Sequence, residues 1–63
     1  MQDFRKLPER LLRLMKLKGI RAVELARRMK QNPSTICRYL KGERIPSLPT
    51  IERIEIILGG KIL

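Results

Sequence analysis

The sequence has no histidine and no tryptophan, and among its 63 residues there is one cysteine, one phenylalanine and one tyrosine. One cysteine excludes an internal disulfide, and the lack of histidine removes the commonest nitrogen ligand for zinc. It also removes the usual general base near neutral pH. We therefore expect a protein that is not an enzyme, has no metal site and no bound cofactor, and is held together by aliphatic packing.

Cys37 is the one candidate nucleophile in the sequence. Arg38 follows it, but no base is available to pair with the thiol, so a small side chain standing where serine could stand is the simpler interpretation. Among the acidic residues, only Glu52 and Glu55 lie close together, and their spacing of three on a helix is typical of a solvated face. No catalytic residue is predicted.

Acidic side chains are scarce too: six face 15 lysines and arginines, which gives a net charge of +9. Such an excess favours DNA, RNA or an anionic membrane surface as partner. No apolar run approaches the roughly 20 residues that span a bilayer, and the opening MQDFRKLPER lacks the apolar centre of a signal peptide. We expect no membrane association. We also expect a cytoplasmic location, because the cytoplasm keeps free thiols reduced.

Helix start and stop signals divide the chain, which is long enough for one domain over residues 1–63. Proline suits the first turn of a helix and glycine its end. These signals predict helices over about 8–18, 22–29, 33–40 and 48–58, and hence an all-α fold. The apolar residues expected on their inner faces are Leu7, Leu11, Leu14, Met15, Ile36, Tyr39, Leu40, Ile51, Ile54, Ile57 and Leu58, and the apolar members of the helix over 22–29 are Val23, Leu25, Ala26 and Met29.

The stretch from about 22 to 41 predicts two short helices joined at a polar break. Asn32 suits the N-cap of the second helix and Pro33 its first turn. Ser34 and Thr35 then present small polar side chains, which allow close approach to another molecule. In so basic a chain, this helix indicates contact with a nucleic acid.

These residues resemble the helix-turn-helix of the phage lambda and 434 repressor and Cro family. The resemblance covers about residues 11–59. It rests on Gly19-Ile20, Glu24-Leu25-Ala26, Pro33-Ser34-Thr35-Ile36, Arg38, Gly42, Pro46-Ser47-Leu48, Thr50-Ile51 and Leu58-Gly59. It implies a compact repressor-like domain of four helices, with five as the alternative. The helix over about 33–40 would then be the recognition helix in the major groove.

By the same resemblance, Asn32, Ser34 and Arg38 are expected to contact bases. Arg38 can bond guanine O6 and N7 through two parallel hydrogen bonds, whereas Asn32 could be used entirely as a helix cap. Backbone contacts, which set affinity and not sequence preference, are expected from Arg21, Ala22, Thr35, Lys41 and Arg44. Further phosphate candidates are Arg5, Lys6 and Arg10.

The chain also departs from the family pattern in and around this unit. Ala22 stands where a glutamine usually clamps the DNA backbone, Lys30 where the tight turn usually has glycine, and Gln31 where an apolar residue usually fills the turn. A non-glycine in a left-handed conformation would cost roughly 1 kcal/mol. Met15 and Leu40 replace an arginine–glutamate pair, and an apolar contact can replace an ion pair without loss of stability.

The resemblance implies a sequence-specific regulator of transcription that binds double-stranded DNA, encoded by a prokaryote or a phage. One short helix reads few base pairs, so a homodimer on a two-fold operator is expected. Ile56, Ile62 and Leu63 are the candidate dimer patch, and the alternative is that Ile62 and Leu63 fold back onto their own chain. An antitoxin with an added protein partner and a nonspecific nucleic-acid-binding protein are the alternative functions. The scarcity of aromatic side chains argues against recognition of single-stranded RNA.

Overall fold

The computed structural model describes residues 4–63, which form a short 3-10 turn, η1 (Phe4–Lys6), and four α-helices. The helices are α1 (Leu7–Lys18), α2 (Ala22–Met29), α3 (Pro33–Lys41) and α4 (Leu48–Leu58). No strand occurs within residues 4–63, so the predicted all-α fold is confirmed. The five-helix alternative is wrong, because residues 61–63 form no helix after the turn at Gly59 and Gly60.

The helix boundaries follow from local chemistry. Asn32 Oδ1 accepts a hydrogen bond of 3.0 Å from the Ser34 N–H at the start of α3, and Ser47 Oγ accepts one of 3.4 Å from the Thr50 N–H at the start of α4. These caps use amides that a helix N-terminus otherwise leaves without partners. All four predicted helices agree with the structure to within one residue at each end.

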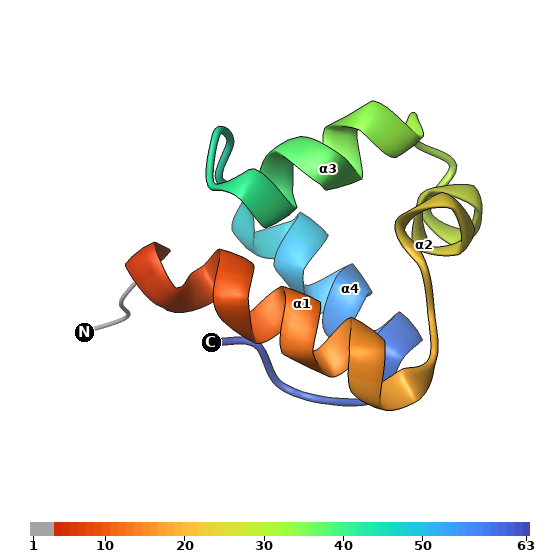
Figure 1. Cartoon of the computed structure of the whole chain (residues 1–63), viewed down its shortest axis with the longest axis horizontal. Helices are drawn as coiled ribbons and strands as arrows, with labels where there is room; N and C mark the ends of the chain where they lie inside the picture. Colours follow the sequence, from red (N-terminus) through yellow and green to blue (C-terminus); the bar gives the residue numbers. More distant parts are fainter. Residues whose placement is uncertain (1–3) are drawn as a thin grey trace.

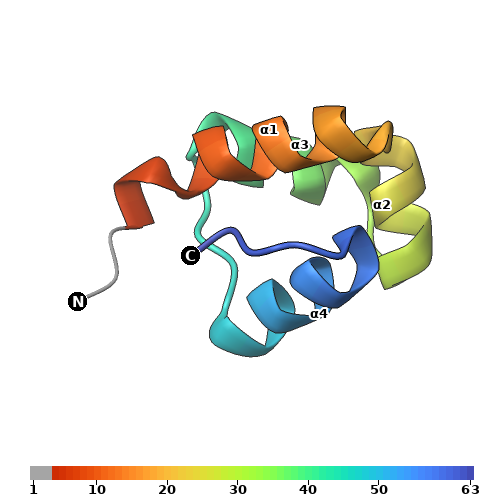
Figure 2. The ribbon, with the colours of Figure 1, turned by 90° about the horizontal axis from the view of Figure 1, so that it is seen from below.

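α1 crosses the front of the domain in Figure 1, and α4 lies behind it. α3 lies along one edge and packs against α2 and α1, while α2 also packs against α4. The view from below in Figure 2 shows the C-terminal tail running between α1 and α4. One long side of α3 therefore faces away from the other elements.

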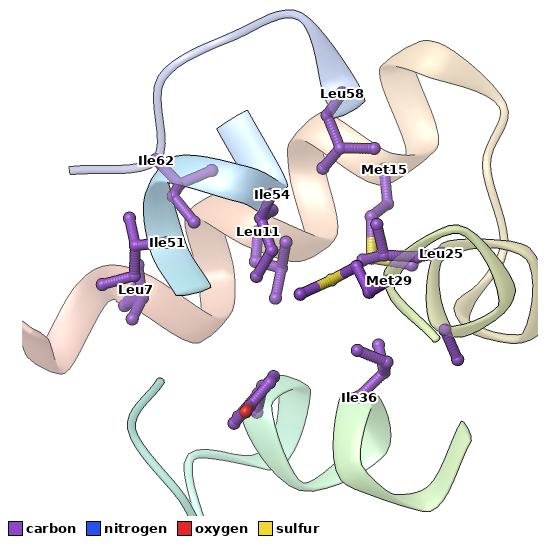
Figure 3. Close-up of a cluster of buried hydrophobic side chains, with 12 residues drawn as sticks. Leu7, Leu11, Met15, Leu25, Met29, Ile36, Ile51, Ile54, Leu58 and Ile62 are labelled. Atoms are coloured by element: carbon purple, nitrogen blue, oxygen red, sulfur yellow. The ribbon is translucent and has the colours of Figure 1, made fainter. Parts of the chain in front are cut away.

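A single cluster of buried apolar side chains joins all four helices (Figure 3). Its members are Leu7, Leu11, Met15, Leu25, Ala26, Met29, Ile36, Tyr39, Ile51, Ile54, Leu58 and Ile62. Leu14, Leu40 and Ile57, which were expected inside, are partly buried against this cluster. Val23, one of the apolar residues of α2, is 56% exposed.

The tail beyond α4 completes the core. Ile62 is 1% exposed, and its backbone N–H donates a hydrogen bond of 2.9 Å to Glu55 Oε2. A Cβ at Gly60 would lie 2.8 Å from Leu14 Cδ1, so the chain passes closely over α1 at this glycine. The tail therefore fills a side of the core that would otherwise be open.

This burial corrects the predicted dimer patch. Ile62 cannot contribute to an exposed surface, because its side chain is part of the domain's own core. Leu63 is partly buried against the same core, whereas Ile56 is 80% exposed. The fold-back alternative is the one that the structure shows for Ile62.

Candidate nucleic-acid interface

The turn between α2 and α3 orients the two helices. Lys30 ends α2 with a left-handed backbone, φ 57° and ψ 42°, whereas α1, α3 and α4 end at glycines with positive φ. Its N–H donates to the Arg27 carbonyl, and the N–H of Gln31 donates to the Ala26 carbonyl at 2.9 Å. The turn therefore keeps the left-handed geometry with a lysine in place of the glycine usual in the family.

Gln31 lies at the centre of this turn and is partly buried. Its side-chain oxygen Oε1 is buried and has no hydrogen-bond partner. A buried acceptor without a partner costs about 1–3 kcal/mol. The turn thus contains two local costs, one from the backbone of Lys30 and one from the side chain of Gln31.

The outer side of α3 presents one continuous row of exposed side chains. Ser34, Cys37 and Lys41 have the i, i+3, i+7 spacing of a single helix face, and Arg38 lies next to them. Ile36 and Tyr39, on the opposite side, are buried in the core. The helix is thus anchored on one side and free to contact another molecule on the other.

The first turn of α3 is closed by hydrogen bonds between Asn32 and Ser34. Asn32 Oδ1 accepts from both the Ser34 N–H and the Ser34 hydroxyl, at 3.0 and 2.8 Å. The amide N–H₂ of Asn32 and the oxygen of Ser34 remain for other partners. The structure therefore shows the cap expected of Asn32. For hydrogen bonds to a base, Asn32 keeps its amide donor and Ser34 keeps its hydroxyl oxygen as an acceptor.

The start of α2 has the features of a phosphate site. Arg21 is the N-cap residue and is exposed, and no side chain caps this helix. The amides of its first turn can therefore bind an anion, which the helix dipole also favours. Glu24 lies in the same turn, but its carboxylate is paired with Arg28 at 3.0 Å.

The other predicted backbone contacts lie around α3. Lys41 and Arg44 are exposed at its C-terminal end, Thr35 is partly buried in its first turn, and Ala22 is partly buried at the start of α2. Lys41 and Arg44 thus lie at the C-terminal end of the exposed row. Away from this row, Met15 is buried and Leu40 is partly buried against the core, so the pair that replaces the family's ion pair is apolar.

Cys37 takes a central place in the exposed row, as its helical spacing from Ser34 and Lys41 indicates. One feature of this region went unnoticed in the sequence. Arg5, which η1 places beside the loop after α3, lines the same groove as Arg44. No sequence signal joins these two arginines.

No group of three or more His, Cys, Asp or Glu side chains that could hold a metal ion is present in residues 4–63. None of the helices in this part of the chain is long and apolar enough to cross a membrane.

Two short helices joined by a tight turn, the second with a polar and basic outer side, define a helix-turn-helix domain. Among known families, residues 11–63 match the model of a family described as helix-turn-helix. The chain belongs to this family, the lambda repressor and Cro-type helix-turn-helix domains, and the family binds DNA. No curated protein and no solved structure matches the chain. The resemblance drawn from the sequence is thereby confirmed.

Proposed function

We propose that this protein regulates transcription by binding specific sequences in double-stranded DNA through α3. The exposed row of Ser34, Cys37, Arg38 and Lys41 carries this proposal, because it lies on a helix whose other side is fixed in the core. An α-helix with its side chains is about 10–12 Å in diameter. The major groove is about 12 Å wide and admits one helix.

Within this row, Arg38 is the main base-reading side chain. Its guanidinium can donate two parallel hydrogen bonds to a guanine, and one such pair contributes about 1–3 kcal/mol of discrimination. Ser34 and Asn32 lie at the N-terminal end of α3 and add contacts through the atoms that the cap leaves available. Arg21, Ala22, Thr35, Lys41 and Arg44 contact phosphates and set the position of the helix.

The regulator acts as a homodimer on a two-fold operator, because one short helix reads too few base pairs. Half-sites should lie 34–36 Å apart, which is one turn of the duplex. Ile56 and Leu63 remain from the predicted patch as its contact surface. Such a protein would work in the cytoplasm of a prokaryote or a phage-infected cell.

An antitoxin is the alternative, and the outer side of α4 favours it. Ile56 there is 80% exposed and Leu48 is 52% exposed, and large exposed apolar side chains are often covered by a partner. Co-purification of a second protein that Ile56→Asp releases would support this function. Binding of DNA would be retained in that case.

Selection from a pool of random duplexes tests the main proposal. The expected result is a two-fold symmetric motif with half-sites one turn apart, bound by two chains in native mass spectrometry. Enrichment of no motif, together with affinity that depends on salt alone, would contradict sequence-specific regulation and favour a nonspecific nucleic-acid-binding protein.

A further inference from the structure

A groove of about 420 Å³ lies between α1 and the C-terminal tail. Figure 2 shows these two segments side by side, and in Figure 1 α1 separates the tail from α3. The lining of the groove consists of three cations and three leucines: Arg10, Arg13, Leu14, Leu17, Lys61 and Leu63. A duplex held against the outer side of α3 would leave this groove open.

Two of the three cations have no anionic partner within residues 4–63. Arg13 lies 3.6 Å from Glu9 on its own helix, whereas Arg10 and Lys61 make no ion pair in this part of the chain. None of the described residues that line the groove is acidic. Because Arg10 belongs to α1 and Lys61 to the tail, an anion between them would be held from both sides of the groove.

The apolar part of the lining is anchored in the domain. Leu14 and Leu63 are partly buried against the core. The tail passes so closely over α1 at Gly60 that a Cβ there would lie 2.8 Å from Leu14 Cδ1. Leu17, the third leucine, is 77% exposed. An aliphatic group in the groove would cover this side chain and remove apolar surface from water.

The size of the groove favours a small molecule over a protein partner. Its volume falls in the range of about 300–1,000 Å³ that small-molecule pockets have. Its lining is also much smaller than the roughly 20–30 residues that each partner contributes to a stable protein interface. Cations beside leucines suit a molecule that has one anionic end and one aliphatic chain.

We propose that this groove binds a free carboxylate with an aliphatic chain, such as a fatty acid of medium length. The carboxylate lies between Arg10 and Lys61, with which it forms charge-assisted hydrogen bonds. The chain lies along Leu14, Leu17 and Leu63. Since α3 takes no part in this groove, the site goes beyond the proposed function and does not depend on it.

Titration with decanoate, kept below its critical micelle concentration and followed by calorimetry, tests this site. One decanoate per chain should bind saturably and shift the methyl NMR signals of Leu14, Leu17 and Leu63. Arg10→Ala/Lys61→Ala should weaken binding about tenfold or more, as expected for loss of charged hydrogen bonds. Decanol, which keeps the chain without the charge, should bind the wild-type protein more weakly than decanoate by a similar factor.

Arg27→Ala/Arg53→Ala is the matched control, because both arginines are exposed and lie outside the groove. This variant loses the same net charge and should bind decanoate as the wild-type protein does. Circular dichroism of each variant verifies that it folds. Equal weakening in the two double variants would show that decanoate responds to net charge alone, and would overturn the groove assignment.

Two further results would contradict the proposal. One is the absence of saturable binding, or binding that leaves the signals of the three leucines unchanged. The other is binding to phosphatidylglycerol vesicles without binding to monomeric decanoate, which would assign this surface to lipid headgroups. None of these measurements involves DNA, so each leaves the proposed function to be tested separately by duplex selection.

Discussion

The carboxylate of Glu55 and the backbone N–H of Ile62 are joined by a hydrogen bond of 2.9 Å. The carbonyl of Glu55 also accepts hydrogen bonds from the N–H groups of Gly59 and Gly60, at 2.8 and 3.2 Å. One residue of α4 thus reverses the chain and fixes the tail, so that Ile62 enters the core. After α4, this hydrogen bond and one isoleucine close the domain.

Glu55→Ala should lower the free energy of unfolding by about 1.5–3 kcal/mol, the usual contribution of a hydrogen bond to a charged group. Urea unfolding followed by circular dichroism measures this change. Glu52→Ala is the control, because Glu52 is exposed on the same helix, and it should change stability by less than about 0.5 kcal/mol. Equal losses in the two variants would show that the Glu55 hydrogen bond contributes nothing specific.

Ile62→Ala should cost about 2–5 kcal/mol, because it removes a fully buried side chain from a small core. Ile56→Ala should cost less than about 0.5 kcal/mol in the monomer, since Ile56 is exposed on the neighbouring helix. Thermal unfolding at low protein concentration compares the two variants. A tolerant Ile62 and a sensitive Ile56 would reverse the assignment of the tail to the core.

Lys30→Gly should raise the free energy of unfolding by about 0.5–1 kcal/mol. Relief of the left-handed backbone contributes about 1–2 kcal/mol, and the greater freedom of glycine in the unfolded chain subtracts about 0.5–1 kcal/mol. Lys30→Ala keeps a Cβ and should give no such gain. A similar stability change in both variants would mean that the loss of the lysine side chain, and not the backbone, is responsible.

Gln31→Leu should stabilise the turn by about 1 kcal/mol, because it removes a buried oxygen that has no partner. Gln31→Glu should act in the opposite direction, since it places a charge at the same buried position. Chemical denaturation of both variants at neutral pH provides the measurement. Stabilisation by glutamate would indicate that Gln31 has a polar environment after all.

The sequence predicted the frame of the domain well, because α1, α3 and α4 carry local start and stop signals of their own. Prolines in first turns and glycines after last turns depend only on neighbouring residues, and the inner faces follow from helical spacing. The tail had no such signal, since the partner of Glu55 is a backbone N–H that no sequence pattern marks. The choice between an exposed and a buried Ile62 could therefore be made only from the structure.

Part of the candidate site could also be predicted, because some of its residues are marked by local sequence signals. Arg38 and Ser34 follow from their place in the helix-turn-helix pattern, and the Asn32 cap follows from its place before Pro33. The proximity of Arg5 to the loop after α3 depends on how η1 packs, which is a tertiary property. Long-range relations of this kind are not encoded in local spacing.

Binding of the wild-type protein, Arg38→Ala and Lys41→Ala to the selected duplex and to its single-base variants tests the central claim most directly. Arg38→Ala should lose about 1–3 kcal/mol of discrimination at one base pair in each half-site, whereas Lys41→Ala should weaken binding to every sequence alike and lower the salt slope. Uniform weakening by Arg38→Ala, with the order of preferred sequences unchanged, would contradict the claim that α3 reads DNA through this arginine.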